Sequence, residues 1–239
     1  MDGVRWLEAE LPGARAAFST RLGGVSETPF DALNVAIMTG DERESVRENR
    51  ARLAAALGRD PLGVVMGRQV HGGELRRHED VQEPRVFSDV VKSPDEADAQ
   101  ATSNPELTPL VMVADCLPVA IAGPRGVAMV HCGWRGLASG IVAKAAKEVG
   151  AEAAAIGPGI GPCCYEVGEE VLAEFDDLDG VADGRMLDLP AVARALLERA
   201  GVHSIASAEI CTSSSPDLFY SHRRDGERTG RQAGLVWMD

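Results

Sequence analysis

Three short runs of uncharged, mostly apolar residues stand close together in the middle of the chain, and they constrain the fold more than any other feature. They cover residues 110–114, 119–122 and 127–131 and consist almost wholly of Val, Ala, Leu, Ile and Met. Runs of this length that are apolar at nearly every position are typical of strands buried on both faces. The sequence therefore predicts a sheet whose two faces are both covered.

Helices and further strands are expected on both sides of these runs. Asp41 begins one helix, with Glu44 as its capping-box partner, and Asp188 begins another that ends at Gly201. Strands and helices are mixed without strict alternation, which predicts an α+β fold in one domain spanning residues 1–239. The expected helices are 42–57, 137–149, 166–175 and 189–200; the further strands are 63–66, 86–91, 153–157, 204–210 and 233–237; and the expected loops are 78–84 and 92–109.

Charge and composition exclude several classes of protein. The net charge of −13 repels phosphate backbones and anionic lipids, so we expect neither nucleic acid nor a membrane as partner. Residues 1–13 lack both the basic and the apolar region of a secretory signal, which favours a cytoplasmic protein. The five cysteines are an odd number and suit reduced thiols, which directs attention to metal-binding or reactive cysteines.

Two histidines and one cysteine stand at the ends of predicted strands. They are His71 in QVHGG, Cys116 in ADCLP and His131 in HCGWRG. This donor set suits Zn²⁺ or copper, and three protein ligands leave a fourth position for water or substrate, as in catalytic zinc sites. The alternative is that Cys116 is a small buried hydrophobe and that the histidines are hydrogen-bonded and idle. Spacing alone does not decide between the two.

Strand alternation narrows the choice of ligand further. Cys132 should point to the face opposite His131, which makes it a poor ligand. Asp115 should point away from Cys116 if the strand continues, although Pro118 can end regular pairing and let the Asp115 carboxylate turn inward.

Several other segments could bind an anion. The turn at residues 133–136 directly precedes a helix expected to begin near Leu137. Arg135 in this turn could hold a phosphate at the helix N-terminus or could simply be solvated. Residues 157–162 match neither a dinucleotide fingerprint nor a P-loop, and Cys163 and Cys164 after them are interpreted as buried structural thiols. Two basic segments, 19–26 with Arg21 and 219–225, could hold a phosphate and stack a heteroaromatic ring, or could be charged surface loops.

Taken together, the motifs resemble a known family. STRLGGVS, ADCLP, HCGWRG, GPGIGPCCYEVG, CTSSSPDLFYSHRRD and GRQAGLVWM resemble the YfiH-type laccase-domain proteins from about residue 18 to residue 238. The resemblance implies two mixed sheets packed as a sandwich with helices outside, a fold shared remotely with a toxin deamidase. It also implies a zinc ion held by His71, Cys116 and His131. One departure is Cys132, which replaces the usual alanine and could favour a softer metal such as copper.

Several activities are described for that family: phosphorolysis of adenosine, inosine and methylthioadenosine, adenosine deamination, copper-dependent phenol oxidation and editing of peptidoglycan precursors. We favour a zinc-dependent purine nucleoside enzyme that uses phosphate, with Cys116 and His131 at the centre. In this interpretation Asp115 moves the proton and Arg21 and Arg135 hold phosphate.

Three alternatives stand beside the nucleoside enzyme. A metal-free hydrolase acting on peptidoglycan precursors would use Cys116 as nucleophile and His131 as base. A copper phenol oxidase needs several copper ions, which five scattered histidines without an HxH pair do not favour. A metal-binding protein without catalytic activity is the third. The sequence indicates no oligomeric state.

Overall fold

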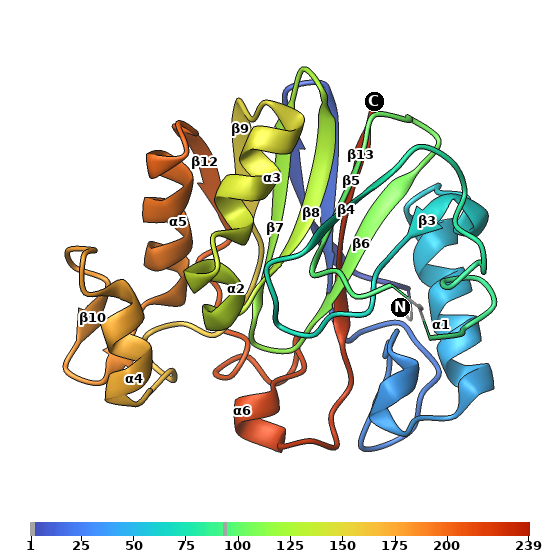
Figure 1. The fold of residues 1–239 in the computed structure, drawn as a ribbon. Helices are drawn as coiled ribbons and strands as arrows, with labels where there is room; N and C mark the ends of the chain where they lie inside the picture. Colours follow the sequence, from blue (N-terminus) through green and yellow to red (C-terminus); the bar gives the residue numbers. More distant parts are fainter. Residues whose placement is uncertain (1–2, 93–94) are drawn as a thin grey trace.

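Two β-sheets stacked face to face form the centre of the computed structural model, which describes residues 3–92 and 95–239 (Figure 1). Within the five-stranded sheet all pairs are antiparallel except β3 with β6, and within the six-stranded sheet all are antiparallel except the two edge pairs. The five-stranded sheet has the order β1 (Trp6–Leu11), β2 (Ala14–Ser19), β13 (Gln232–Met238), β6 (Thr108–Val113) and β3 (Val64–Val65). The six-stranded sheet has the order β12 (Ser204–Ser207), β9 (Ala153–Ile156), β7 (Leu117–Gly123), β8 (Gly126–Cys132), β5 (Ala99–Thr102) and β4 (Leu75–His78).

Small apolar side chains fill the layer between the sheets. Ala16 and Phe18 of the first sheet meet Ala120 and Met129 of the second, all buried. Along β8, residues 127 and 129 face this layer while residues 128, 130 and 132 face the opposite side. By the same alternation His131 faces the layer between the sheets.

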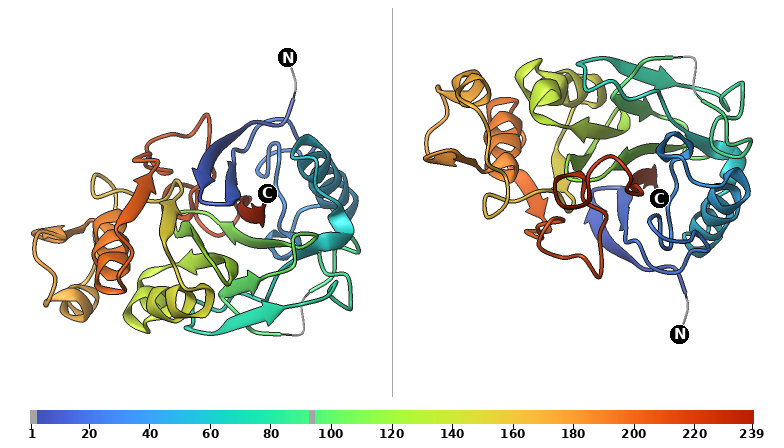
Figure 2. Two further views of the ribbon diagram at one scale, coloured as in Figure 1. Left: turned by 90° about the horizontal axis from the view of Figure 1, so that it is seen from above. Right: turned by 90° about the horizontal axis from the view of Figure 1, so that it is seen from below.

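Helices cover the two outer faces. The five-stranded sheet packs against α1 (Arg43–Ala56) through Leu53 and Ala54, and the six-stranded sheet packs against α3 (Ile141–Val149) and α5 (Leu189–Arg199). Figure 2 shows α1 and α3 on different sides of the paired sheets. The expected sandwich of mixed sheets with outer helices is therefore confirmed. The remaining elements are α2 (Trp134–Ala138), α4 (Glu169–Leu172), α6 (His222–Asp225), β10 (Ala182–Asp183), β11 (Met186–Leu187) and short 3₁₀ turns at Ile37–Thr39, Pro61–Gly63 and Ala173–Phe175.

Two helix predictions differ from the structure in ways that matter for the site. The helix expected at 137–149 begins at Trp134 and is broken at Gly140, whose φ of +78° suits glycine, so α2 has only five residues and ends before α3 begins. A helix of this length gives Arg135 no extended helix terminus to bind an anion. The helix expected at 166–175 is reduced to α4 and the following 3₁₀ turn.

The capping prediction for α1 was wrong in detail. Glu42 is the residue at the helix start and makes no side-chain cap. The carboxylate of Asp41 instead accepts hydrogen bonds from the amide of Glu42, the hydroxyl of Ser26 and the side-chain amide of Asn34. Asp188 of α5, by contrast, accepts the amide of Ala191 as predicted.

Two predictions in the region before β6 were wrong. The strand expected at 86–91 is a turn, because the guanidinium of buried Arg50 takes the carbonyl oxygens of Val86 and Phe87 that a strand would use. The loop expected at 92–109 contains β5 and the start of β6, and residues 93–94 within it lie outside the described residues. The strands β1, β2 and β4 were also missed. Among the described residues, every helix is too short or too polar to cross a membrane.

Candidate metal centre and its cavity

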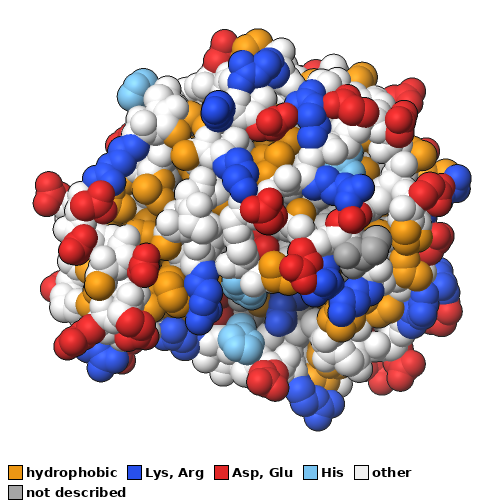
Figure 3. All heavy atoms as spheres, in the orientation of Figure 1, with side chains coloured by type: hydrophobic (Ala, Val, Ile, Leu, Met, Phe, Trp, Pro, Cys, Tyr) orange, Lys and Arg blue, Asp and Glu red, His pale blue; other side chains and the backbone are white. Residues whose placement is uncertain are grey.

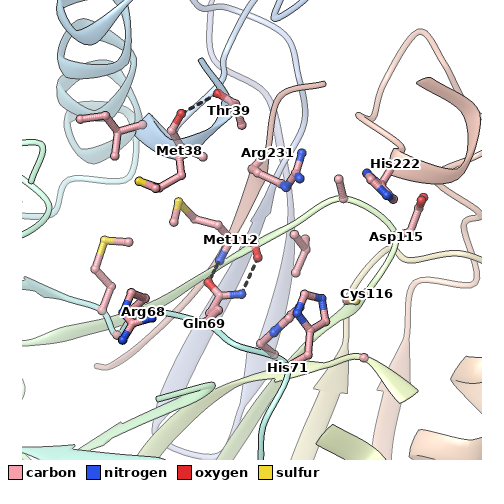
Figure 4. Close-up of a pocket in the computed structure, with 18 of the residues that line it drawn as sticks. Met38, Thr39, Arg68, Gln69, His71, Met112, Asp115, Cys116, His222 and Arg231 are labelled. Atoms are coloured by element: carbon pink, nitrogen blue, oxygen red, sulfur yellow. Dashed lines mark hydrogen bonds between the residues drawn. The ribbon is translucent and has the colours of Figure 1, made fainter. Parts of the chain in front are cut away.

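Three side chains from distant parts of the sequence meet at one end of the sandwich. The nitrogen and sulfur donors of His71, Cys116 and His131 lie within 4.8 Å of one another. His131 is the second-last residue of β8 and is 3% exposed, while Cys116 ends the bend between β6 and β7. Because β7 pairs with β8 from Leu117 and Cys132 onward, the bend carries Cys116 next to His131. His71 reaches the same point from the loop before β4 (Figure 4).

Asp98 holds two of these three side chains in place. One carboxylate oxygen accepts the Nδ1 hydrogen of His131 at 2.7 Å and the amide of His71 at 2.9 Å. The other accepts the amides of Val70 and Gly72 at 3.0 and 2.9 Å. With Nδ1 bound to a carboxylate, Nε2 of His131 is the nitrogen left for a metal ion, an arrangement common around protein-bound zinc. Sequence reasoning missed Asp98, which lies in the expected loop 92–109.

The charges of the site favour a thiolate next to an imidazolium. Burial raises the pKa of Cys116, but the charge of His131 and hydrogen bonds from His131 and His71 outweigh it and lower the pKa to about 6. Burial likewise lowers the pKa of His131, but the charge of Cys116 and the hydrogen bond to Asp98 raise it to about 9. A thiolate is both the form that binds metals and the form that acts as a nucleophile.

The space around the donors also fits a bound ion. A Cβ added to Gly133 would lie 2.9 Å from the Cys116 sulfur and 3.2 Å from Cδ2 of His71, so only glycine leaves the donors where they are. The rings of His71 and His131 meet edge to face with their centroids 4.8 Å apart. Two imidazoles and one thiolate in this arrangement suit Zn²⁺ or copper and exclude a preference for Mg²⁺ or Ca²⁺.

Replacing Gly133 with alanine should therefore weaken metal binding. The backbone φ of −82° at Gly133 is open to alanine, so the effect is steric and falls on Cys116 and His71. We expect the affinity to drop by roughly tenfold or more, the scale seen when groups around a metal site are displaced. Metal competition with a chromophoric chelator measures it, and Gly3→Ala is the control because a Cβ there meets nothing within 4 Å. Equal affinities in both variants would contradict this steric account.

The donors open into a cavity of about 540 Å³, a size typical of small-molecule sites. Away from the donors the wall combines apolar side chains with polar ones, and Figure 4 shows Thr39, Arg68 and Gln69 on the same side as Met38 and Met112. The end near the donors is polar and cationic. Figure 3 shows histidine and Lys or Arg side chains gathered around a hollow in the surface, although the whole chain carries a net charge of −13.

Asp115 lines the cavity beside Cys116. Its backbone has φ +89°, and residues 114–116 form a bend rather than a strand, so the alternation that would turn Asp115 away does not apply. Its carboxylate accepts the Thr212 hydroxyl at 2.7 Å and the amide of Arg223 at 2.6 Å. Asp115 therefore fastens α6 to the edge of the cavity.

The two arginines singled out in the sequence lie in different places. Arg135 lines the cavity, is exposed, and stacks on the ring of Trp134 at 4.4 Å. Arg21 is not among the cavity-lining residues; its guanidinium binds the carbonyl oxygen and carboxylate of Asp31 and lies over Tyr220. The geometry gives Arg21 a structural task, bridging the loop at Asp31 to the C-terminal segment.

Three cationic or titratable side chains from the C-terminal region complete the polar end. His222 and Arg223 stand on α6, and Arg231 precedes β13 and lies among the cavity residues in Figure 4. Arg223 lies over the ring of Tyr165 at 5.1 Å, and its Nη1 donates to the carbonyl oxygens of Cys164 and Glu166. The sequence analysis proposed segment 219–225, which includes Arg223, as a possible phosphate-binding segment, but it proposed no role for Arg231.

The remaining cysteines divide into two kinds. Cys132 is fully buried among apolar side chains on the face of β8 opposite His131, as alternation predicts, and burial raises its pKa. Cys163 and Cys164 were interpreted as buried thiols, and this was wrong: Cys163 is exposed and Cys164 is half-buried. Cys163 and Cys164 lie in a turn, where the first is exposed and the second packs partly against the apolar core.

Comparison with known proteins agrees with the fold. The family described as multi-copper polyphenol oxidoreductase laccase matches residues 15–239. The chain belongs to this family. Its members include the purine nucleoside phosphorylase YfiH of Shigella flexneri, 38% identical over 240 residues that cover 95% of this chain and 94% of the relative. A purine nucleoside phosphorylase of Streptomyces coelicolor is 39% identical, with 95% of this chain and 96% of the relative covered. The YfiH-type resemblance seen in the motifs is thus confirmed.

Solved structures of the YfiH type share the whole fold. YfiH of Bacillus licheniformis superposes with a TM-score of 0.85 at 31% identity, covering 95% of this chain and 93% of that one. YlmD of Geobacillus stearothermophilus gives 0.85 at 32% identity, covering 98% and 96%. The sandwich fold is therefore that of the YfiH-type family.

Proposed function

We propose that this protein is a metal-dependent purine nucleoside phosphorylase with adenosine deaminase activity, acting in the cytoplasm on adenosine, inosine and methylthioadenosine. The observation that carries the proposal is a single cavity that combines apolar side chains with several arginines and has a three-ligand centre in its wall. A purine nucleoside with phosphate needs these surroundings: a flat apolar base, a polar sugar and an anion. The names of the YfiH-type relatives point to the same reaction class.

The ligand set fits zinc, with copper as the softer alternative. His71, Cys116 and His131 would hold the ion, and Asp98 would fix the orientation of His131. Bound there, the ion would supply a Lewis acid at the edge of the cavity, which stabilises negative charge as it develops on the substrate.

Phosphorolysis depends mainly on the cationic residues, because they must bind the phosphate. Phosphate must approach the anomeric carbon of the ribose as the bond to the base breaks, and the sugar carbon gains positive charge while the base gains negative charge. Arg135, Arg223 and Arg231 line the polar end and would hold the phosphate dianion there. The methionine and valine side chains of the cavity wall would exclude water from the base.

Deamination requires a group that moves a proton. Asp115 uses one acceptor site on each carboxylate oxygen for Thr212 and Arg223, and a carboxylate offers about four such sites. It therefore keeps acceptor capacity toward the cavity. His222, brought to the cavity by the same α6, is a second candidate for this task.

The test is product analysis by mass spectrometry after incubation with adenosine, with and without phosphate. We expect adenine and ribose 1-phosphate only when phosphate is present, and inosine in both conditions. Arg135→Ala should raise the KM for phosphate by roughly 10- to 100-fold, since a hydrogen bond to a charged group contributes about 1.5–3 kcal/mol. Arg15→Ala is the matched control, because Arg15 pairs with Glu8 and Asp239 on the surface of the first sheet. Absence of all three products would overturn the proposed function.

A second candidate function rests on the pairing of the Cys116 thiolate with the His131 imidazolium. Cysteine hydrolases use a thiolate nucleophile, a histidine beside it and a third group that orients the histidine. Cys116, His131 and Asp98 provide these three groups in that sequence of contacts. Such an enzyme would cleave a peptidoglycan precursor without metal. It would keep full activity after chelation and lose it on alkylation of Cys116.

A further inference from the structure

A second cluster of thiols lies outside the cavity. The sulfur atoms of Cys163, Cys164 and Cys211 lie within 4.8 Å of one another, and those of Cys163 and Cys164 are 3.5 Å apart. The first two come from the turn after Pro162 and the third follows β12, so residues 47 or more positions apart in the sequence meet here. Neither the proposed reaction nor the first metal centre uses them.

The backbone holds this cluster together without any covalent link. Gly159 and Cys211 form an isolated parallel bridge, in which the amide of Thr212 donates to the carbonyl oxygen of Gly159 at 2.9 Å. A Cβ added to Gly161 would lie 3.3 Å from Cβ of Cys211 and 3.9 Å from the sulfur of Cys163. The three thiols are thus positioned by main chain and close packing rather than by long mobile side chains.

The spacing of the sulfurs fits one ion. Three thiolates bound tetrahedrally to Zn²⁺ at about 2.3 Å lie about 3.8 Å apart, close to the 3.5 Å between the sulfurs of Cys163 and Cys164 and within the 4.8 Å that bounds all three separations. A groove of about 410 Å³ adjoins Cys163 and Cys211, so a fourth position can be reached from solvent.

We propose that Cys163, Cys164 and Cys211 form a second metal site, specific for a thiophilic ion such as Zn²⁺ and independent of the first centre. Three thiolates and no nitrogen or oxygen donor within the set make it softer than the His71, Cys116 and His131 centre. Metal binding releases the thiol protons and forms three metal–sulfur bonds, with no change in oxidation state.

The site is tied to the cavity on both sides. Tyr165, which follows Cys164, lines the cavity beneath Arg223. Thr212, which follows Cys211, donates its hydroxyl to Asp115. An ion that joins the two segments would therefore restrain Tyr165 and Asp115 while touching no substrate.

The experiment is anaerobic titration of reduced, chelator-treated protein with Co²⁺ and then Zn²⁺, followed by absorption spectroscopy and metal analysis. We expect two ions per chain in the wild type and one in Cys163→Ser/Cys211→Ser. Cys116→Ser should also retain one ion, with the strong sulfur-to-cobalt absorption of a three-thiolate site. Ser207→Ala is the matched control, because Ser207 lines the same groove without offering a sulfur, and it should bind two.

Three results would overturn the proposal. In the first, the Cys116→Ser variant binds no metal. In the second, the cobalt absorption of Cys116→Ser remains after Cys211→Ser is added to the same chain. The third is wild-type protein that forms a Cys163–Cys211 disulfide in air, detected as a loss of two hydrogens, yet takes up no second ion when reduced. Because stoichiometry is read without any substrate, the outcome does not depend on the proposed nucleoside reaction.

Discussion

Cys116→Ala should remove both the metal ion of the first centre and turnover of adenosine. The substitution deletes one of three ligands and also the charge that raises the pKa of His131. Replacing mere supporting groups around a metal costs roughly 10–100-fold in affinity or activity, so loss of a ligand should cost at least about 100-fold. Metal content after dialysis and product formation from adenosine measure the two effects.

Cys132→Ala is the control for this experiment. Cys132 is the neighbouring thiol, but it is fully buried on the opposite face of β8 among apolar side chains. Its replacement removes one buried sulfur and should lower stability by about 1 kcal/mol while leaving metal content unchanged. If Cys132→Ala released the metal as Cys116→Ala does, the assigned ligand set would be wrong.

His71→Ala separates the two candidate chemistries. In the metal-dependent enzyme His71 is a ligand, and its loss should follow that of Cys116. In the metal-free hydrolase the working groups are Cys116, His131 and Asp98, and His71 only assists by its hydrogen bond to the Cys116 thiolate, so its loss should reduce activity much less than loss of Cys116. An active His71→Ala variant together with an inactive Cys116→Ala variant would favour the hydrolase.

The parts of this fold that the sequence predicts best are those that depend on local pattern. The all-apolar runs became β6, β7 and β8, and Asp188 begins α5 as its capping chemistry indicates. The motifs that carry Cys116 and His131 lie at the ends of β7 and β8, so their convergence could be anticipated, whereas His71 comes from the loop before the unpredicted strand β4. The opposite orientation of Cys132 follows from alternation along β8.

The parts that failed depend on long-range contacts. β5 consists of Ala, Gln, Ala and Thr and is recognisable only by its position between β4 and β8. The turn at 86–91 has the apolar residues of a strand, but buried Arg50 takes two of its carbonyl oxygens, and Nη2 of Arg50 finds no partner among the described residues. Asp98 precedes β5 and was missed with it, although it organises the site.

Asp98→Asn is expected to cost more than any other change outside the ligands. Asp98 is fully buried and accepts one side-chain and three backbone hydrogen bonds with its two oxygens. Asparagine offers one oxygen, so its NH₂ group would face donors that then have no acceptor, at a cost of about 1–3 kcal/mol for each. Because these donors include the backbone of His71 and the ring of His131, we expect metal affinity to fall roughly 10–100-fold.

The loss of stability in Asp98→Asn should depend on pH in a defined direction. Burial raises the pKa of Asp98, but the hydrogen bonds from His131 and from the amides of Val70 and Gly72 outweigh it, and the net pKa lies below the ordinary 3.8. A carboxyl with a lowered pKa stabilises the fold above its unfolded pKa and ceases to do so as the pH falls through the folded value. On the alkaline side the raised pKa of His131, about 9, decides: the stabilisation from protonated His131 is complete below its unfolded pKa of about 6.5 and is lost as the pH rises from there through about 9.

Urea unfolding of the metal-free wild type and Asp98→Asn across pH measures this difference. The gap in unfolding free energy should be widest between about pH 4 and about pH 6.5, should narrow below about pH 4, and should shrink again as the pH rises from about 6.5 to about 9. Asp95→Asn is the nearby control: Asp95 pairs with Arg76 in a half-exposed ion pair, which contributes about 0–1 kcal/mol. A gap for Asp98→Asn that stays constant from pH 3 to pH 10 would show that the carboxylate charge does not hold His131, and the pairing that prepares this histidine for the metal would have to be abandoned.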